Sequence, residues 1–418
     1  MEQRKFSQFF YHLFALGISF ESFVIMLGAP ISVTDITVLF LLSYSLIFHQ
    51  KILLNWMLFF TLIFGFYIFV ANIINMQIEQ DFSSEGFFKN YLRVVAVMIM
   101  ITLIPSLLKE FELKKLLKGI LFALKFHGIL LIIDPFVIYP WTFSDYGLII
   151  GMETNDLLPA ERARGLWMEP SYASAFIGLM MVLVLQYERN TKERIATSSD
   201  YFILFLALLS TASVTGASVA GILILMNLMV HRKRLFKATS MVKTISLSLI
   251  AIPIMVFVLA SSFVFITDRL SAGLAGGSTL QRLVGSTLFT LDIMEEKPFI
   301  GSGLGGKNQQ AFLDKYGEPL LATTLQQADG EAVLSQSATT FWAALSGAGG
   351  LPTLLIFYLL ILGNLILDKR TFFVGTMIFF LGISKGGVFD VSLWFVIAAA
   401  VSFRYIKEDI FEEKLLER

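Results

Sequence analysis

The sequence predicts an all-α polytopic membrane protein with about 12 transmembrane helices. Hydrophobic residues make up 56% of its 418 positions, and the mean hydropathy is +0.74. Charged residues make up only 15%, whereas soluble domains have roughly 25%. Apolar stretches of the length that crosses a bilayer, about 20 residues, recur along the chain. A bilayer is therefore the natural solvent for most of this chain.

These apolar stretches define the expected helices. They cover residues 8–28, 31–48, 52–74, 91–108, 117–139, 169–187, 201–213, 216–230, 244–266, 339–365, 371–384 and 388–404. The block 201–230 is interpreted as two short helices, because the polar run from Thr211 to Ser218 interrupts it. The same argument divides the last pair at Lys385. Ten helices are the alternative if these blocks are not divided.

The distribution of basic residues predicts the topology. Lys and Arg are enriched in cytoplasmic loops of membrane proteins. If both ends of the chain lie in the cytoplasm, most of the 32 Lys and Arg fall in the inside segments. The apolar stretch 8–28 is too long for a signal-peptide core and has no small-residue cleavage site, so it is expected to span the membrane.

We expect residues 1–418 to form a single integral membrane domain with two long outer loops. The first outer loop covers 140–168 and the second, larger one covers 267–338. Apolar residues at helical spacing predict an amphipathic helix over 278–296, capped by Ser278 and ended by Pro298. Such a helix is typical of a membrane interface.

Composition excludes several kinds of site. A net charge of zero gives no basic surface for nucleic acid. The chain has no Cys and only four scattered His, so no metal site and no cofactor are expected. The glycine-rich segment 298–306 lacks the Lys-Ser/Thr of a phosphate-binding loop. We interpret it as a tight turn that returns the chain to the membrane.

The richest polar cluster near the outer face is the segment from Glu161 to Ser171, at the entry of the sixth helix. Pro170 suits the first turn of that helix. Arg164 is suited to binding a phosphate through two hydrogen bonds, and Glu169 to deprotonating a hydroxyl. The alternative is that Glu169 complements the helix dipole and the arginines bind lipid headgroups.

Other charged residues are candidates because charge near a bilayer is costly. Arg282 lies on the predicted outer-loop helix, and Arg93 lies one turn into the fourth helix. Lys385 flanks the last outer turn. Lys125 and His127 lie inside the fifth helix, where the lysine needs a partner. The sequence leaves that partner open between Glu21 and Asp35.

Three segments resemble bacterial O-antigen and capsule polymerases (Wzy-type) and the related O-antigen ligases. The first is Arg164-Gly-Leu-Trp-Met-Glu169-Pro-Ser171. The second is Gln281-Arg282, followed after a helix by Pro298-Phe-Ile-Gly-Ser-Gly-Leu-Gly. The third is the helix entry beginning Thr340-Phe-Trp and ending Gly-Gly-Leu-Pro352. Their order and the predicted layout also match that superfamily.

The chain departs from the ligases in two places. Their His before the third segment is missing, because 334–340 reads Leu-Ser-Gln-Ser-Ala-Thr-Thr. The Ser-Arg found in many ligases is also missing, because 210–216 reads Ser-Thr-Ala-Ser-Val-Thr-Gly. Both differences favour a polymerase over a ligase. They also leave the general base open.

The resemblance implies a metal-independent glycosyltransferase of the bacterial inner membrane, with a fold similar to GT-C-like enzymes. Its donor would be a glycan on undecaprenyl pyrophosphate, and its acceptor the non-reducing end of another lipid-linked repeat unit. The expected catalytic residues are Glu169, Arg164 and Arg282. The expected substrate-binding residues are Arg93, Arg162, Trp167, Ser171 and Lys385. A chain-length-regulating partner stays open.

Two other classes remain as alternatives. A lipid-linked oligosaccharide flippase or secondary carrier would have internal repeats and charges at mid-membrane. We find no repeat, and most candidate charges lie near the outer face. A cell-wall glycosyltransferase of the shape and division type has a similar layout, and only the Glu-Pro-Ser segment argues against it.

Overall fold

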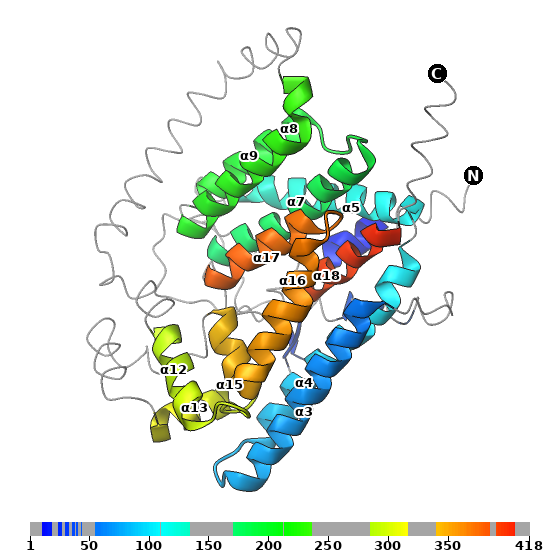
Figure 1. Ribbon diagram of the computed structural model, residues 1–418. Helices are drawn as coiled ribbons and strands as arrows, with labels where there is room; N and C mark the ends of the chain where they lie inside the picture. The colour runs from blue at the N-terminus through cyan, green and yellow to red at the C-terminus, as the bar shows by residue number, and fades with distance from the viewer. Residues whose placement is uncertain are drawn as a thin grey trace.

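The structure is a computed structural model of the chain. It describes residues 11–18, 24–26, 30–32, 36–37, 39–40, 43, 55–108, 110–133, 170–211, 213–235, 285–316, 340–384 and 390–405. The regular structure in this part is helical, apart from strands β1 (Val24–Met26) and β2 (Pro30–Ser32). These strands form one antiparallel pair, with Ile25 opposite Ile31. Figure 1 shows the helices gathered in one bundle.

The element bounds follow the chain. The longer helices are α3 (Trp56–Ile78), α4 (Ser84–Leu107), α5 (Glu110–Ile133), α7 (Pro170–Thr191) and α9 (Val214–Leu235). A further run joins α15 (Phe341–Leu355), the π-helix η5 (Ile356–Leu362) and α16 (Gly363–Leu367). The shorter elements are α8 (Ser198–Ser210), α12 (Ser286–Glu296), α13 (Gly306–Tyr316), α17 (Phe372–Ser384), α18 (Val391–Ser402) and η6 (Phe403–Tyr405).

Six helices in the described part of the chain are long and apolar enough to cross a membrane. Their lengths of 18 to 27 residues correspond to about 27–40 Å at a rise of about 1.5 Å per residue, against a hydrocarbon core of about 30 Å. Three shorter apolar helices, α8, α17 and α18, accompany them. The chain is therefore a multi-pass, helical membrane protein. The count of 12 spans stays a prediction.

Most predicted helices are present within a few residues of their expected bounds. The division of the 201–230 block is confirmed, because α8 ends at Ser210 and α9 begins at Val214. Local capping accounts for the start of each helix. Ser213 accepts a hydrogen bond from the Gly216 N–H at the start of α9, and the Thr197 and Asp200 side chains form a capping box that starts α8. The predicted helix 244–266 lies outside the described residues.

The predicted helices 8–28 and 31–48 are wrong in part, because β1 and β2 occupy residues 24–26 and 30–32. Only residues 11–18 of the first stretch are described as helical. Pro30 gives a physical reason for the difference. It has no N–H to donate in a helix interior, and it disfavours helical geometry at the preceding residue. Hydrophobicity alone does not register this effect.

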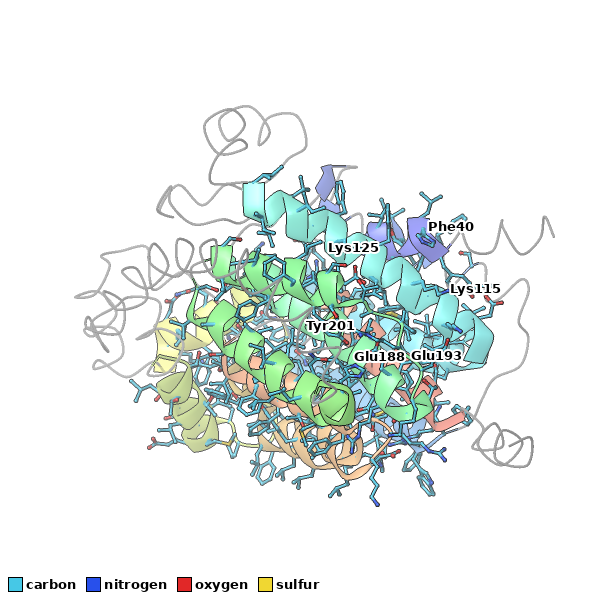
Figure 2. All side chains as sticks on the ribbon, turned by 90° about the horizontal axis from the view of Figure 1, so that it is seen from above. Phe40, Lys115, Lys125, Glu188, Glu193 and Tyr201 are labelled. Carbon is cyan, nitrogen blue, oxygen red and sulfur yellow. The ribbon has the colours of Figure 1, made fainter. Side chains whose placement is uncertain are left out.

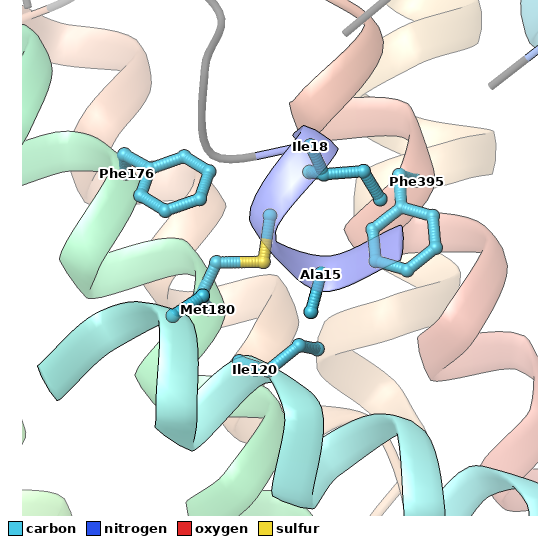
Figure 3. Close-up of a pocket in the computed structure, with 7 residues that line it drawn as sticks. Ala15, Ile18, Ile120, Phe176, Met180 and Phe395 are labelled. Atoms are coloured by element: carbon cyan, nitrogen blue, oxygen red, sulfur yellow. The ribbon is translucent and has the colours of Figure 1, made fainter. Parts of the chain in front are cut away.

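The bundle is centred on α7 and α18. In α7, 89% of the apolar window is buried, against 33% for α9. Every residue of α18 is buried. Small side chains allow this close packing, since a Cβ added at Gly178 of α7 would lie only 2.8 Å from Val219 of α9. The helix over residues 11–18 packs against the same centre, and its Ala15 and Ile18 meet Phe176, Met180 and Phe395 without leaving room for a water molecule (Figure 3).

Helix ends gather on two opposite faces. One face, here called the basic face, joins the α4–α5, α7–α8 and α16–α17 connections. There Lys114 pairs with Glu193, Asn190 donates to the Arg370 carbonyl at 3.0 Å, and Arg370 donates to the Arg404 carbonyl at 2.7 Å. These segments were all predicted to lie inside. Figure 2 labels Lys115 on α5 and Glu188 on α7, the two helices whose ends meet in this region.

The other face, here called the motif face, joins segments that were all predicted to lie outside. It contains the α3–α4 turn, the start of α7, the α8–α9 turn, α12, α13 and the start of α15. Glu79, just after α3, pairs with Lys297, just after α12. A Cβ added at Gly382, near the end of α17, would lie 2.8 Å from Phe341 at the start of α15. The described segments on this face are thus ones that the sequence analysis had placed together on one side, and the assignment of that side to the outside stays a prediction.

Candidate active site

The first family-like segment leads directly into α7. Pro170 is the first residue of this helix, as predicted, because its missing N–H has no partner there in any case. Ser171 follows it and is partly buried. Arg162, Arg164, Trp167 and Glu169 lie outside the described residues, and Glu169 directly precedes Pro170 in the sequence.

A buried cluster of hydroxyl groups joins the first turns of α7 to the α8–α9 turn. Ser174 Oγ lies 3.1 Å from Thr211 Oγ1 and 3.3 Å from Ser213 Oγ. Thr211 and Ser213 lie 3.0 Å apart, and Ser213 accepts a hydrogen bond from the Gly216 backbone. All three hydroxyls are almost fully buried. They tie the start of α7 to the polar turn that the sequence had predicted to divide two helices, but for which it gave no tertiary contact.

The second and third family-like segments form one packed unit. Residues 298–306, here called the glycine loop, lie against a break in α15 at Gly349 and Gly350. Leu351 donates its backbone N–H to the Pro298 carbonyl at 2.7 Å, and Gly303 donates to the Gly347 carbonyl at 2.9 Å. The loop therefore provides hydrogen-bond partners for backbone groups near the break in α15.

Glycine is required at the contact between these two segments. Gly350 has φ of +70°, a region that side chains disfavour, and a Cβ there would lie 2.3 Å from the Pro298 carbonyl oxygen. Gly301 has φ of +66°, and a Cβ there would lie 2.4 Å from the Ser346 carbonyl oxygen. This packing explains the glycines without a phosphate-binding role.

Helix α3 holds the glycine loop from its other side. Asn72 accepts a hydrogen bond from the Leu304 N–H at 2.6 Å and donates to the Ala348 carbonyl at 2.9 Å. Asn75 donates to the Ile300 and Gly301 carbonyls. Tyr67 donates its hydroxyl to the Phe299 carbonyl. None of these three residues was predicted from the sequence, although two Asn in an apolar helix indicate buried polar contacts.

A single carboxylate joins the two outer-loop helices to the end of α3. Glu79 Oε1 lies 2.7 Å from Lys297 Nζ, and Glu79 Oε2 lies 2.9 Å from Lys315 Nζ. The hydrogen bond from Lys297, and then that from Lys315, lower the pKa of Glu79 below its ordinary value of 4.5. Lys297 follows α12 and Lys315 lies in the last turn of α13, so Glu79 anchors both helices.

The predicted helix 278–296 is described from its later part, as α12. Its end at Glu296, before Pro298, is confirmed, whereas Ser278 and Arg282 lie outside the described residues. The expected single turn after it is wrong, because Gly306 starts the further helix α13. Phe312 of α13 and Phe289 of α12 pack edge to face, at 5.9 Å between ring centroids. Two helices share one apolar interior here, and the glycines signalled only the turn between them.

Arg93 has a different place from the predicted one. Helix α4 begins at Ser84, capped by Ser83, and not at residue 91. Arg93 therefore lies about two and a half turns into the helix at about 3.6 residues per turn. Its side chain is exposed. The mild polarity of residues 84–90 had concealed the first two turns of this helix. Lys385 lies outside the described residues and directly follows α17.

The partner of Lys125 is Asp200 of α8, at 3.2 Å between Nζ and Oδ1. Glu21 and Asp35, between which the sequence had left the partner open, lie outside the described residues. Figure 2 places Lys125 and Tyr201 on neighbouring helices. A contact across 75 positions of sequence depends on how α5 packs on α8, which no local pattern reveals.

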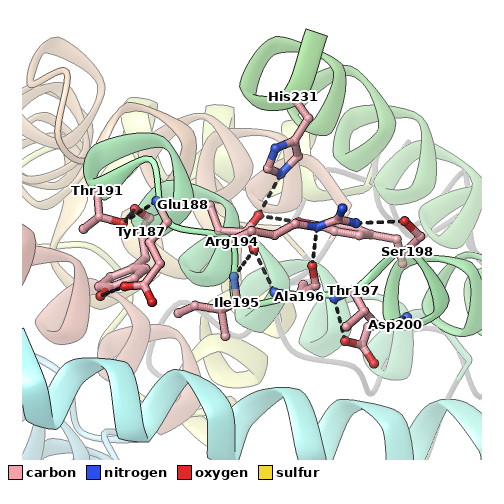
Figure 4. A network of polar contacts seen from close by, with 12 residues as sticks. Tyr187, Glu188, Thr191, Arg194, Ile195, Ala196, Thr197, Ser198, Asp200 and His231 are labelled. Atoms are coloured by element: carbon pink, nitrogen blue, oxygen red, sulfur yellow. Dashed lines mark hydrogen bonds and ion pairs between the residues drawn. The ribbon is translucent and has the colours of Figure 1, made fainter. Parts of the chain in front are cut away.

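The sequence analysis also missed a buried carboxylate, Glu188, on the basic face (Figure 4). Glu188 accepts hydrogen bonds from the backbone N–H groups of Ile195 and Ala196, both at 2.7 Å. Its second oxygen lies 2.7 Å from the Tyr201 hydroxyl and 2.8 Å from His231 Nε2. These partners satisfy the carboxylate fully, so Glu188 ties α7 to α8 and α9 far from the motif face.

Within the described ranges, no group of three or more His, Cys, Asp or Glu residues has the arrangement of a metal site. The polar groups that the structure brings together at the motif face are hydroxyls, amides and the Glu79 ion pairs. They form a scaffold around the ends of the three family-like segments. The expected catalytic residues precede this scaffold in sequence, at Glu169 before α7 and Arg282 before α12.

Comparison with known proteins identifies the family. The family model described as WcaD colanic acid polymerase matches residues 10–311. This region is well over half of the chain and includes Arg164, Glu169, Arg282 and the glycine loop, whereas the third segment at 340–352 lies beyond it. No curated protein and no solved structure matches the chain. The extent of the family match shows that the chain belongs to the WcaD colanic acid polymerase family.

Proposed function

We propose that this polysaccharide polymerase transfers a glycan from undecaprenyl pyrophosphate to the non-reducing end of a lipid-linked repeat unit. The single observation that carries the proposal is the family match over residues 10–311. Membership makes the chain a glycosyltransferase-type polymerase of the inner membrane, acting on a lipid-linked oligosaccharide. The identity of donor and acceptor, the outer-face location and the residue roles are the proposed parts.

In the proposed reaction, an acceptor hydroxyl attacks the anomeric carbon of the donor glycan. A new glycosidic bond forms while the bond between that carbon and the pyrophosphate oxygen breaks. Glu169 takes the proton of the acceptor hydroxyl. Arg164 and Arg282 stabilise the negative charge that develops on the leaving pyrophosphate. Because two guanidinium groups supply this charge, no metal ion is required.

Five further residues are proposed to bind substrate. They are Arg93, Arg162, Trp167, Ser171 and Lys385. The proposal for two of them is supported by neighbouring helix ends: Ser171 lies in the first turn of α7, and α17, which Lys385 follows in sequence, ends on the same motif face. Arg93 is exposed on α4, so its proposed contact is with the headgroup region and not with a buried cavity.

The lipid chain of the substrate is proposed to lie between helices. A pocket of about 250 Å³ between α7, α8 and α9 supports this part of the proposal. Apolar and aromatic side chains line it, among them Phe202, Phe205 and Leu223. Such a lining favours hydrocarbon over sugar. The pocket has room for only part of a long prenyl chain.

The proposed topology places both ends of the chain in the cytoplasm and the motif face outside. Support comes from the basic face, where Lys114 pairs with Glu193 and Arg370 donates to the Arg404 carbonyl. Lys and Arg are enriched on the cytoplasmic side of membrane proteins. The outer loops 140–168 and 267–338 then cover the reacting sugars and exclude water.

Alanine substitution tests the residue roles. We expect Arg164→Ala, Glu169→Ala and Arg282→Ala each to abolish polymer formation while the protein still inserts into the membrane. Lys369→Ala is a matched control, because Lys369 is an exposed cation of the basic face. Wild-type activity in any two of the three variants would contradict the site assignment.

A further inference from the structure

The glycine loop has the sequence of a membrane-buried segment, although it lies within a predicted outer loop. Residues 298–306 read Pro-Phe-Ile-Gly-Ser-Gly-Leu-Gly-Gly and carry no charge. Lys297 and Lys307 flank the segment on both sides. The Lys307 side chain is exposed, whereas the Lys297 ammonium group pairs with Glu79 at the end of α3. Charged groups thus bound the segment at both ends, as is typical of an interface.

The depth of this loop can be estimated along α3 and α15, the two helices that contact it. Tyr67 donates its hydroxyl to the Phe299 carbonyl. Tyr67 lies twelve residues before Glu79 at the end of α3, which corresponds to about 18 Å at about 1.5 Å per residue. On the other side, Pro298 pairs with Leu351, ten residues into the span that begins at Phe341, or about 15 Å along it. Asn75, which donates to the Ile300 and Gly301 carbonyls, lies only four residues before Glu79, or about 6 Å along the helix. These contacts place the loop about 6–18 Å from the end of α3, alongside the apolar part of the span.

Nine backbone groups of the loop are hydrogen-bonded to protein groups, which lowers the cost of placing them in hydrocarbon. The partners of its carbonyl groups are Leu351 N for Pro298, Tyr67 Oη for Phe299, Asn75 Nδ2 for Ile300 and Gly301, Asn308 Nδ2 for Leu304, and the N–H groups of Asn308 and Gln309 for Gly305. Its N–H groups at Gly301, Gly303 and Leu304 donate to Lys297 O, Gly347 O and Asn72 Oδ1. Irregular backbone is tolerated at membrane depth only under such conditions.

The side chain of Phe299 points away from this scaffold. It is 67% exposed, although its own carbonyl is bonded to a residue near the middle of α3. An aromatic ring this exposed within a spanning region is suited to hydrocarbon contact. At the other end of the loop, Lys307 is also exposed and starts the polar helix α13.

We propose that residues 298–306 form a re-entrant segment, and that Phe299 contacts the acyl chains of bulk bilayer lipid in the leaflet of the motif face. The inference is independent of the polymerase reaction and of which face is cytoplasmic. The segment enters the bilayer after Lys297, lies in the break of α15 and returns to the interface at Lys307. Asn72 holds it there through its bonds to Leu304 and Ala348.

Single-cysteine spin labelling tests this proposal, because the chain contains no Cys. Phe299→Cys, Lys307→Cys and Leu359→Cys are labelled in detergent and reconstituted into phosphatidylethanolamine and phosphatidylglycerol vesicles without prenyl lipid. Leu359 is 65% exposed at the middle of a span and is the lipid-facing reference. Collisions with oxygen report hydrocarbon, and collisions with a polar nickel chelate report water.

We expect the oxygen-to-nickel collision ratio at position 299 to approach that at 359 and to exceed that at 307 by roughly tenfold, because hydrocarbon excludes polar solutes. Adding Asn72→Ala to Phe299→Cys should raise nickel collisions at 299. Nickel collisions at 299 equal to those at 307 would overturn the proposal. Low collisions with both reagents at 299 would also overturn it, since protein and not lipid would then cover the ring.

Discussion

The side chain of Asn72 accepts a hydrogen bond from the backbone N–H of Leu304 at 2.6 Å, across 232 positions of sequence. The same amide donates to the Ala348 carbonyl. One fully buried residue of α3 therefore connects the glycine loop to the broken helix α15. Because this contact unites two segments that resemble polymerase motifs, its loss should affect both stability and the shape of the motif face.

We predict that Asn72→Ala destabilises the protein by about 1–3 kcal/mol, because it leaves buried backbone groups at Leu304 and Ala348 without partners. The measurement is unfolding in mixed micelles with increasing sodium dodecyl sulfate. Asn90→Ala is the matched control, because the hydrogen bond of the Asn90 amide within the described part of the chain goes to Gly86 of its own helix. Equal stability of the two variants would contradict the bridging role of Asn72.

We predict that Gly350→Ala prevents the glycine loop from packing on α15. Gly350 has a positive φ, and an added Cβ would meet the Pro298 carbonyl oxygen at 2.3 Å. Thermal unfolding in detergent should show a clearly lower midpoint. Gly221→Ala is the control, since an added Cβ there meets nothing within 4 Å. This control should not lower the midpoint, because Ala is more stable than Gly in a helix interior by about 0.5–1 kcal/mol. A Gly350→Ala variant as stable as Gly221→Ala would refute this packing.

The Glu79 ion pairs predict a pH dependence of stability. The pKa of Glu79 is lowered in the folded state by Lys297 and Lys315. A lowered pKa stabilises the fold above the ordinary value of 4.5, and this stabilisation is lost as the pH falls through the folded-state pKa. Glu79→Gln should therefore be less stable than wild type at pH 7, and the difference should shrink toward pH 3.

The control for this measurement is Glu85→Gln, because Glu85 is exposed on α4 and has no ion pair among the described residues. Thermal midpoints of the three proteins at pH 7 and pH 3 give the comparison. A stability difference between wild type and Glu79→Gln that stays constant from pH 7 to pH 3 would show that the carboxylate charge is not responsible.

We predict that chelators leave the polymerase activity unchanged, because Arg164 and Arg282 supply the positive charge that a metal would otherwise provide. The test is polymer formation by purified protein with and without ethylenediaminetetraacetate. Loss of activity that Mg²⁺ restores would contradict the arginine-based mechanism and require oxygen ligands for the ion.

Hydropathy, together with the polar and helix-breaking residues between apolar stretches, predicted most of the fold. Apolar length located α3, α5, α7 and α9 because the bilayer requires it, and the polar run at Thr211 correctly divided α8 from α9. The same reasoning was wrong at Pro30, where a strand pair replaces helix, and at Ser84, where polar residues begin α4. Hydrophobicity does not record backbone geometry or local capping.

Tertiary partners were beyond prediction from one chain. Glu79 with Lys297, Lys125 with Asp200 and Glu188 with His231 join residues 43 to 218 positions apart. Each pair depends on which helices pack together, which periodicity does not specify. The candidate catalytic residues came from charge near the predicted outer face and then from motif resemblance, and the family match covers Arg164, Glu169 and Arg282. Their roles rest on the proposed chemistry.

The most direct test of the central claim is an assay with purified protein in detergent. The substrate is the undecaprenyl-pyrophosphate-linked repeat unit of the host, without nucleotide or metal, and the products are separated on a gel. We predict a ladder of lengthening glycans that Arg164→Ala and Arg282→Ala abolish. Absence of a ladder, with the same protein moving that lipid across liposome membranes, would contradict a polymerase and indicate a flippase.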